Sequence, residues 1–289
     1  MIGRERMDER ILITGAGGML GREVAERLKA EGCKVTATDL QDLNIADPEA
    51  CYKSIEKTDA QIVINCAAYT QVDKAEEENE KAMEINGNAP GFLAVASKKA
   101  GALLIHYSTD YVFDGTKDAP YLEDDQPSPL SAYGRSKLEG EKRIQSSGCR
   151  HLIIRTEWLF GKGGSHFIRS IVNAAGRLPH LDVVNDQFGS PTYAYDAAEA
   201  TAMLIRAGAE GIVHFTSSGS TSWFDFTKLI FAERGINKEV RPMSTDKLNR
   251  PAKRPSNSRL DCSKYVRITG KTPPPYEDAL RRYLKTGDL

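Results

Sequence analysis

Cysteine is scarce in this chain, and its spacing excludes two kinds of structural site. The 289 residues include five cysteines, at positions 33, 51, 66, 149 and 262. Their number is odd and no two of them form a close C-x-x-C pair, so the sequence offers neither a disulfide framework nor a structural zinc site. Scattered thiols of this kind are typical of proteins in a reducing compartment.

Long hydrophobic runs and an excess of one charge are also missing. No stretch approaches the roughly 18 apolar residues that a membrane span requires, and the N-terminal stretch 1–8 is short and charged, without the apolar core of a signal peptide. The formal net charge of −1 gives no reason to expect nucleic acid or an anionic membrane surface as a partner. We therefore expect a soluble, cytoplasmic protein with no nucleic-acid or membrane partner.

What the chain does contain is the composition of a globular enzyme. Hydrophobic residues make up 40% of it and charged residues 27%, which leaves ample material for a core. The length allows one large domain or two closely packed ones. Because there is no internal repeat, low-complexity tract or flexible linker, we expect the C-terminal part to fold onto the front half.

A glycine-rich loop near the N-terminus stands between an expected strand and an expected helix. The β-branched run Ile11–Thr14 meets Gly15–Gly21, which has the spacing G-x-x-G-x-x-G, and a helical pattern follows as far as Gly32. In a dinucleotide site such glycines make the tight turn, let the backbone approach the pyrophosphate and let the helix pack closely, with its N-terminus facing the anion. The residues that we predict to bind the dinucleotide in this loop are Gly15, Gly18, Met19, Leu20 and Gly21.

The second expected strand, Lys34–Thr38, is followed directly by Asp39. A carboxylate at this position can accept hydrogen bonds from the adenosine ribose hydroxyls and would repel a 2′-phosphate, which favours NADH over NADPH. The alternative, that Asp39 merely begins a turn, stays open. Small residues after the third expected strand, Gln61–Cys66, would let a cofactor ribose lie close to the backbone. Further residues assigned to the cofactor site are Asn44, Ile45, Ala67, Ala68, Tyr69, Tyr133 and Lys137.

Strands and helices alternate along the first half of the chain. Further strands are expected at Ala102–Tyr107 and His151–Arg155. This alternation implies right-handed crossovers and an α/β fold, a Rossmann-type doubly wound parallel sheet with a smaller C-terminal substrate-binding domain. After residue 157 the strict alternation breaks. We expect residues 1–157 to form the dinucleotide-binding domain, with 195–216 packing back onto it. Residues 158–194 and 217–289 would form the substrate domain.

Local signals place several helix ends. Asp47 precedes Pro48 and is expected to be an N-cap, with the proline in the first helical position. Ser131 is expected near the N-cap of the helix that carries Tyr133. The charged run 73–80 is most simply a solvated helix face, and residues 82–100 are expected to continue as helix until Gly101 ends it.

Tyr133 and Lys137 are four residues apart, so on a helix they lie on the same face. A tyrosine has an ordinary pKa of about 10, and an adjacent ammonium group stabilises the phenolate and lowers that pKa. Thr109 lies just beyond a strand, at the sheet edge where ligands collect. Together the three can hand a proton to a carbonyl oxygen, which requires a hydride source. The alternative is an exposed tyrosine–lysine pair on a surface helix, since this spacing is common by chance.

Two features have both a structural and a functional interpretation. The tail Arg250–Asp261 is basic and proline-rich; it is either a solvated loop or a cationic lip in which Arg254 binds a diphosphate bidentately. Trp158 follows the strand His151–Arg155 and is either a core residue or a platform for a sugar ring. From the residues alone, the core interpretation of Trp158 is favoured.

The chain resembles the extended short-chain dehydrogenase/reductases and, within them, the dTDP-4-dehydrorhamnose reductases. The general features of that superfamily are the glycine loop and Thr109 with Tyr133 and Lys137. The more specific ones are the stretches NCAAYTQVDKAE at 65–76, STDYVFDG at 108–115, NDQFGSPT at 185–192 and RPSNSRLD at 254–261. The resemblance covers nearly the whole chain, from Arg10 to Leu284.

The resemblance implies reduction of the 4-keto group of dTDP-4-dehydro-6-deoxy-L-mannose to dTDP-L-rhamnose. Tyr133 would donate the proton, Lys137 would bind the nicotinamide ribose and lower the Tyr133 pKa, and Thr109 would hydrogen-bond the substrate oxygen. The family uses NADPH or NADH, so Asp39 indicates a preference only. The resemblance also favours the interpretation of Trp158 as a platform for the sugar ring over its interpretation as a core residue. The substrate-binding residues that we carry over are Thr109, Asp110, Tyr111, Trp158, Asn185, Gln187 and Arg254.

One departure from the family concerns metal and oligomeric state. Some members dimerise through magnesium held by glutamates, one of them just after a segment of the type found at 185–192. Here the chain continues Tyr193-Ala-Tyr-Asp196, with no glutamate before Glu199. We therefore expect no metal site and either a monomer or a homodimer.

Four alternative functions share this fold. A non-catalytic dinucleotide-binding regulatory subunit, like that of methionine adenosyltransferase, would not need Thr109, Tyr133 and Lys137 together. A 4,6-dehydratase would need an Asp-Glu pair after the threonine, where this chain has Asp110-Tyr111, and a 4-epimerase would retain its cofactor tightly. The strongest alternative is a reductase of another 4-keto sugar nucleotide, because base and sugar selectivity depend on the shape of the pocket.

Overall fold

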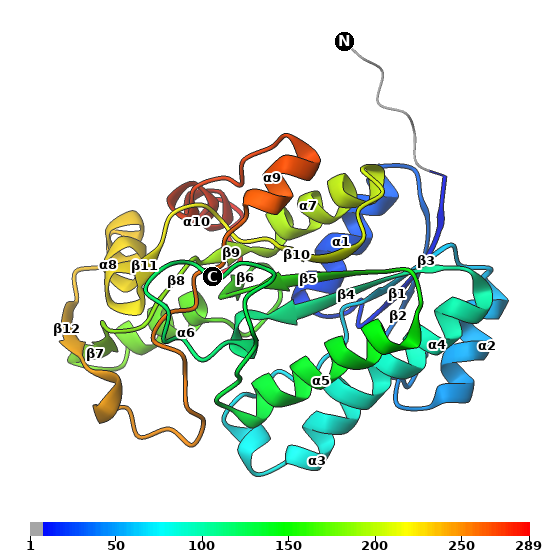
Figure 1. Ribbon diagram of the computed structural model, residues 1–289. Coiled ribbons are helices and arrows are strands. Elements are labelled where there is room, and N and C mark those ends of the chain that lie inside the picture. Colours follow the sequence, from blue (N-terminus) through cyan, green and yellow to red (C-terminus); the bar gives the residue numbers. More distant parts are fainter. Residues whose placement is uncertain (1–7) are drawn as a thin grey trace.

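A computed structural model describes residues 8–289, so the expectations for residues 1–7 lie outside it. Its centre is a parallel sheet of six strands in the order β10-β5-β4-β3-β1-β2 (Figure 1). The strands are β1 Arg10–Thr14, β2 Lys34–Thr38, β3 Ile62–Asn65, β4 Leu103–Thr109, β5 His151–Thr156 and β10 Gly211–His214. The predicted doubly wound parallel sheet is confirmed.

The strand order reverses between β1 and β3. The chain runs from β1 outward to β2 and then crosses back to β3 on the other side of β1. In open α/β sheets the crevice outside the carboxyl ends of the strands at such a reversal is where ligands bind. The fold therefore places its ligand crevice beside the loop that follows β1.

Helices cover both faces of the sheet (Figure 1). Ile11 and Ile13 of β1 belong to the core between the sheet and helices α1 Met19–Ala30 and α7 Ala194–Arg206. Leu12 belongs to the core on the opposite face of the sheet. Successive side chains of a strand face opposite ways, so a strand buried on both faces becomes the continuous apolar run seen in the sequence. The helices over the second face are α2 Pro48–Thr58, α4 Ala89–Ala100 and α5 Ala132–Ser147.

The expected helix starts are confirmed. Asp47 accepts hydrogen bonds from the backbone of Glu49 and Ala50, and Pro48 is the first residue of α2. The Ser131 hydroxyl accepts from the Gly134 nitrogen at 3.1 Å and so begins α5. Each side chain satisfies backbone donors that a helix leaves without an internal partner.

The stretch 73–88 departs from the expected regular helix. It forms a 3₁₀ turn at Lys74–Glu76, a short α3 at Asn79–Ala82 and a π-helical turn at Met83–Asn88 before α4 begins. The Asn86 side chain bonds the backbone of Tyr69 and the hydroxyl of Ser136. A wide turn that carries a buried polar contact is the usual setting of a π-bulge.

A second, separate core lies beside the sheet, at the left of Figure 1. Phe160, Phe226 and Tyr283 are among its buried aromatic residues. Its helices and strands are β6 Leu159–Phe160, α6 Phe167–Ala175, β7 His180–Val184, β8 Phe188–Gly189, β9 Thr192–Tyr193, β11 Thr221–Ser222, α8 Trp223–Arg234, β12 Glu239–Met243 and α10 Tyr276–Leu284. Short 3₁₀ turns lie at Asp110–Val112 and Thr245–Lys247.

One C-terminal helix packs differently from the expectation. Helix α9, Ser263–Thr269, contacts α7 and β10. Its Tyr265 belongs to the core between the sheet and helices α1 and α7. It lies within the range 217–289 that we assigned to the substrate domain. Hydrophobic residues of α9 therefore cover the edge strand β10 rather than the second core. Within residues 8–289, none of the helices combines the length and the apolar character that crossing a bilayer would take.

A buried ion pair joins α5 to the sheet. Arg155 of β5 donates from Nε and Nη2 to both carboxylate oxygens of Glu141, at 2.9 and 2.6 Å. The side chains are only 2% and 1% exposed. Glu139 and Arg143 form a second ion pair along the same helix, at 2.7 Å, and that pair is partly exposed to solvent.

We predict that Glu141→Gln lowers the free energy of unfolding by roughly 3–5 kcal/mol, because it leaves the Arg155 charge buried without a counter-charge. Glu139→Gln, on the same helix, should cost about 0.5 kcal/mol or less, since its pair with Arg143 is screened by solvent. Urea denaturation of both variants measures the difference. Equal losses would show that Glu141 does not compensate a buried charge.

Candidate functional site

The turn after β1 is packed against the end of β3. Gly15 has φ +66°, and a Cβ added to it would lie 2.6 Å from the Ala67 nitrogen. At Gly21, in the first turn of α1, a Cβ would collide with the Gly15 carbonyl oxygen. Only glycine combines that backbone conformation with those approaches. The glycine spacing is therefore required by the geometry of the turn.

The N-terminus of α1 opens from this turn. Its N-cap, Gly18, supplies no side-chain hydrogen bond, and the first turn contains no acidic residue. The backbone N–H groups of Met19 and Leu20 accordingly have no capping side chain. Free donors and the positive end of the helix dipole suit a phosphate group.

Asp39 lies beside the glycine turn. Its carboxylate accepts hydrogen bonds from the Gly17 nitrogen at 3.0 Å and from the Leu40 nitrogen at 2.9 Å. Asn44 and Ile45, which we also assigned to the cofactor site, differ in their exposure to solvent. Asn44 is exposed and accepts from the Ala46 nitrogen, whereas the side chain of Ile45 is 5% exposed within the core. The Ile45 side chain is therefore part of the core and cannot contact a ligand.

The segment after β3 is held by two asparagines that the sequence did not single out. Asn65 accepts from the Ala67 nitrogen at 3.1 Å. Asn86 bonds both the nitrogen and the carbonyl oxygen of Tyr69, at 2.8 and 2.9 Å. Ala68 lies between these anchored residues, and the Tyr69 side chain is buried. The backbone of 67–69 is thereby fixed along the wall of the crevice.

Thr109, Tyr133 and Lys137 gather at the carboxyl edge of the sheet. Thr109 is the last residue of β4, Tyr133 is in the first turn of α5, and Lys137 is one turn further along. Lys137 Nζ donates to the Tyr107 carbonyl at 2.6 Å and lies 3.3 Å from His106 Nε2. Tyr133 and Thr109 share a hydrogen bond, whereas the contacts of the Lys137 amine are with the Tyr107 carbonyl and His106.

The electrostatics of Tyr133 differ from the expectation. Burial, followed by the charge of Asp110, raises the pKa of Tyr133, and only the hydrogen bond with Thr109 lowers it. The expected lowering by Lys137 is absent, because its amine is directed at the Tyr107 carbonyl. Burial also lowers the pKa of Lys137 to about 8, against the opposing charges of Glu141 and Cys66.

Asp110 is the buried acid of this site. It accepts hydrogen bonds from Thr109 at 2.8 Å and from the Ser258 hydroxyl at 2.5 Å. Burial raises its pKa to about 6 despite these bonds. Ser258 belongs to the C-terminal tail and was missed as a site residue, because nothing in the sequence pairs positions so far apart.

The basic tail is tied to the front half of the chain rather than free. Arg250 and Arg254 each donate to Asp73 at 2.9 Å, and the Ala252 nitrogen donates to the same carboxylate at 3.4 Å. Arg254 also hydrogen-bonds Tyr111. The expected cationic lip is therefore a clamp whose charge is partly neutralised, although Arg254 still lies beside Tyr111 in the site.

Trp158 has a left-handed backbone, with φ +47°. Its ring stacks on Trp223 with centroids 3.4 Å apart and planes 9° from parallel. Gly189 lies against the pair: a Cβ there would lie 2.5 Å from the indole of Trp158. A bulky residue in this backbone region is strained, and such strain concentrates at functional sites. Trp223 was missed because its stacking partner lies on another element.

Asn185 and Gln187 lie in the second lobe, by which we mean the helices and strands around the second core. Gln187 is 3% exposed and donates to the Thr245 hydroxyl at 3.0 Å. Asn185 is exposed, and its backbone nitrogen donates to the Met243 carbonyl. The hydrogen bonds of these two residues therefore join them to the end of β12 rather than to Thr109, Tyr133 or Lys137.

No group of three or more His, Cys, Asp or Glu side chains within residues 8–289 is arranged to hold a metal ion. Glu199, the first glutamate after the 185–192 segment, is paired with Arg27 at 2.7 Å.

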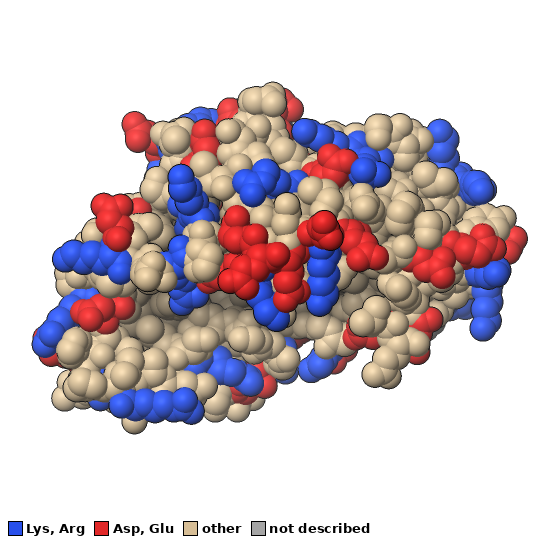
Figure 2. All heavy atoms as spheres, turned by 90° about the horizontal axis from the view of Figure 1, so that it is seen from below, with Lys and Arg blue, Asp and Glu red and all other residues tan. Residues whose placement is uncertain are grey.

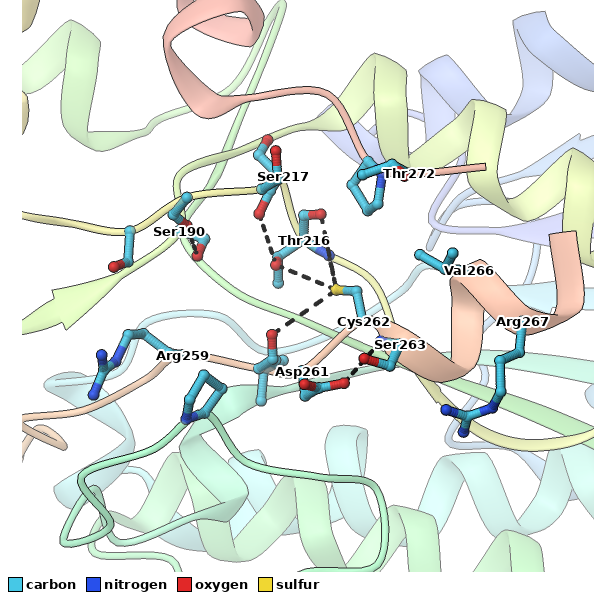
Figure 3. Close-up of a pocket in the computed structure, with 16 residues that line it drawn as sticks. Ser190, Thr216, Ser217, Arg259, Asp261, Cys262, Ser263, Val266, Arg267 and Thr272 are labelled. Carbon is cyan, nitrogen blue, oxygen red and sulfur yellow. Dashed lines mark hydrogen bonds between the residues drawn. The ribbon is translucent and has the colours of Figure 1, made fainter. Parts of the chain in front are cut away.

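The surface shows where molecules can approach. On the face in Figure 2, acidic and basic side chains are interspersed and a hollow enters the left half, beneath the second lobe. A separate cavity of about 600 Å³ opens between the loop after β10 and the start of α9 (Figure 3). Ser217, Cys262 and Arg267 line it, and Thr109, Tyr133 and Lys137 do not. The cavity is therefore distinct from the site around those three residues.

The chain is similar to known proteins over almost all of its length. A family model described as the RmlD substrate binding domain matches residues 9–288. The spore coat polysaccharide biosynthesis protein SpsK of Bacillus subtilis is 39% identical, covering 96% of this chain and 97% of its own. A dTDP-4-dehydrorhamnose reductase of Burkholderia thailandensis is 40% identical, covering 87% and 90%.

Solved structures agree. The crystal structure of dTDP-4-dehydrorhamnose reductase from Bacillus anthracis in complex with NADP has a TM-score of 0.93 and 36% identity, covering 97% of this chain and all of that one. The resemblance of the sequence to this group is confirmed, and the chain belongs to the RmlD substrate binding domain family.

Proposed function

We propose that this protein reduces the 4-keto group of dTDP-4-dehydrorhamnose to give dTDP-L-rhamnose, with NADH or NADPH as the hydride donor. The observation that carries the proposal is the hydrogen bond of Tyr133 with Thr109 at the carboxyl edge of the sheet that also carries the glycine turn, with Lys137 one turn along the same helix. Relatives that match over most of the chain bear the name of this reductase, and a solved relative holds NADP.

The residues of the crevice fit a dinucleotide. The turn at Gly15 brings backbone close to Ala67, and the uncapped N-terminus of α1 offers N–H groups to a pyrophosphate. In the proposal Gly18, Met19, Leu20 and Gly21 bind the phosphates. The proposed ribose and base contacts are Asp39, Asn44, the Ile45 backbone, Ala67, Ala68 and Tyr69. When bound, the nicotinamide supplies the hydride for the carbonyl carbon.

Tyr133 is the proposed proton donor to the carbonyl oxygen. Its raised pKa keeps the phenol protonated at neutral pH, so the proton is present when the substrate arrives. Thr109 hydrogen-bonds Tyr133 and faces the same oxygen. Lys137, anchored by the Tyr107 carbonyl, would bind the nicotinamide ribose and, when protonated, stabilise the phenolate that forms as the proton leaves.

The substrate would lie between the sheet edge and the second lobe. We propose Asp110, Tyr111 and Trp158 as contacts to the sugar, and Arg254 for the diphosphate. Asn185 and Gln187 would shape the loop that faces it. The proposed dinucleotide domain consists of residues 1–157 and 195–216. The proposed substrate domain consists of residues 158–194 and 217–289, except that helix α9 packs on the dinucleotide domain.

Asp39 favours NADH in this proposal. Its carboxylate is fixed by Gly17 and Leu40 where it would accept ribose hydroxyls, and its charge would repel a 2′-phosphate. The enzyme is proposed to act without a metal, as a monomer or a homodimer. The second candidate, reduction of another 4-keto sugar nucleotide, uses the same proposed catalytic residues and differs only in the residues around the sugar and base.

The first experiment is an assay of NADH and NADPH oxidation with dTDP-4-dehydrorhamnose generated in situ by the upstream dehydratase and epimerase. We expect turnover that yields dTDP-L-rhamnose, followed by the absorbance of the reduced nicotinamide and by chromatography of the product. Folded protein that binds the dinucleotide but gives no turnover would contradict the proposal and favour another keto-sugar or a regulatory subunit.

Tyr133→Phe should lower turnover by about a hundred- to ten-thousand-fold, because it removes the proton donor. Dinucleotide affinity, measured by fluorescence titration, should change little. Tyr52→Phe, which removes a hydroxyl from α2 on a different part of the surface, is the matched control. Retained activity in Tyr133→Phe would remove this residue from its role.

Asp39→Ala should narrow the preference for NADH over NADPH, by about tenfold in the ratio of the two kcat/KM values, because the repulsion of the 2′-phosphate is lost. Asp124→Ala removes an exposed carboxylate from the loop before α5 and should leave the ratio as it is. An unchanged ratio in Asp39→Ala would show that Asp39 does not read the ribose.

A further inference from the structure

A chain of buried hydrogen bonds runs beneath the site from β1 to α5. Thr14 Oγ1 donates to Asn65 Oδ1 at 2.7 Å, and Asn65 Nδ2 lies 3.0 Å from His106 Nδ1. His106 Nε2 lies 3.3 Å from Lys137 Nζ. The exposed fractions of the four residues are 1%, 1%, 1% and 3%. The proposed reaction uses Lys137 and assigns no role to Thr14, Asn65 or His106.

The backbone fixes the orientation of Asn65. The Ala67 nitrogen donates to one side-chain atom of Asn65 at 3.1 Å. A backbone N–H only donates, so that atom is the carbonyl oxygen, and the NH₂ group faces His106. His106 Nδ1 must then accept.

The protonation of His106 follows from that orientation. Burial, together with the charge of Lys137, lowers the pKa of His106 well below its ordinary value, so the ring is neutral. A neutral imidazole carries one proton. Since Nδ1 accepts from Asn65, the proton is on Nε2 and points at Lys137.

We propose that His106 is a positioning residue that Asn65 holds in the Nε2–H tautomer, so that an N–H group faces Lys137 and favours the neutral amine over the ammonium. An ammonium group has only donors to offer to that N–H, whereas a neutral amine accepts from it. The Tyr107 carbonyl, at 2.6 Å, keeps the nitrogen in place in either state.

The other groups around Lys137 act in the opposite direction. Glu141, one turn along α5, and Cys66, at the end of β3, raise the Lys137 pKa. Glu141 is itself paired with Arg155. Tyr133 lies one turn before Lys137 on the same helix and gives up its proton in the proposed reaction. Burial and His106 therefore counter two groups that favour the ammonium.

The consequence concerns the proton that Tyr133 loses. A lysine that titrates near neutral pH can return a proton towards the phenolate and be recharged from solvent, which a lysine with its ordinary pKa of about 10.4 does poorly. This consequence rests on the proposed function of Lys137. The tautomer of His106 and the titration of Lys137 do not, because both are measured without substrate.

The first test is ¹⁵N NMR of the histidine rings in the full-length protein, with the His106 signals assigned from their loss in His106→Gln. We expect a protonated Nε2 and an unprotonated Nδ1. A proton on Nδ1 would overturn the proposal without reference to any variant's stability.

The second test follows lysine protonation by NMR of ¹³Cε-labelled lysine. His106→Gln puts an amide at the position of Nε2, which can turn its oxygen to Lys137, and should raise the Lys137 pKa by about one unit. Asn65→Asp should raise it further, because its carboxylate forces the proton onto Nδ1 and also adds a negative charge near Lys137, so His106→Gln is the variant that isolates the effect of the N–H group. Lys98, bonded to the Ser147 carbonyl on the surface, is the internal reference and should not shift.

His106→Asn is the matched control, because its amide occupies the position of Nδ1, keeps the contact with Asn65 and presents no oxygen to Lys137. Its shift should be smaller than that of His106→Gln. An unchanged Lys137 titration in both His106→Gln and Asn65→Asp would contradict the proposal. If the protein does reduce the sugar, the basic limb of its kcat/KM profile should move with the Lys137 pKa; absence of turnover would contradict the proposed function alone.

Discussion

The close approach of the glycine turn to the end of β3 constrains the rest of this structure. Gly15 and Ala67 lie so near that a Cβ on the glycine would sit 2.6 Å from the Ala67 nitrogen. Backbone bonds from Ala16 to Thr38 and from Cys66 to Thr14 hold the three strand ends in register. Because all six strands are parallel, the same edge also carries Thr109 and the start of α5. The proposed dinucleotide site and the proposed catalytic residues are therefore placed by one packing arrangement.

Most of the fold was predictable, because its signals are local. The apolar run at β1 and the caps Asp47 and Ser131 each act within a few residues, and a parallel sheet buried on both faces follows from the alternation. The elements that carry Thr109, Tyr133 and Lys137 were predictable for a similar reason: Tyr133 and Lys137 are four residues apart on one helix, and Thr109 ends a strand. The division into domains did not anticipate α9, whose position depends on packing against β10 rather than on its neighbours in sequence.

What the sequence did not reveal depends on contacts between distant residues. Asn86 was placed inside a regular helix, yet its side chain holds the backbone of Tyr69 and the turn around it is π-helical. Ser258 reaches Asp110 from the tail, and Trp223 stacks on Trp158. The pKa of Tyr133 was expected to fall beside Lys137 and is instead raised by burial. Desolvation depends on everything that surrounds a group, so spacing alone gives the wrong sign here.

The tail is joined to the front half of the chain by charge as well as by backbone bridges and by the apolar packing of Leu260. Burial tends to raise the pKa of Asp73, but hydrogen bonds from Arg254 and Arg250 outweigh it and hold that pKa at about 2. A carboxyl whose pKa is lowered by folding stabilises the folded state at pH values above the pKa that it has in the unfolded chain. This stabilisation is lost as the pH falls towards 2. At neutral pH the clamp is closed. Since Asp73 and Arg250 are partly exposed, salt screens them, so this part of the attachment weakens at high ionic strength while the buried contacts of Ser258 and Leu260 remain.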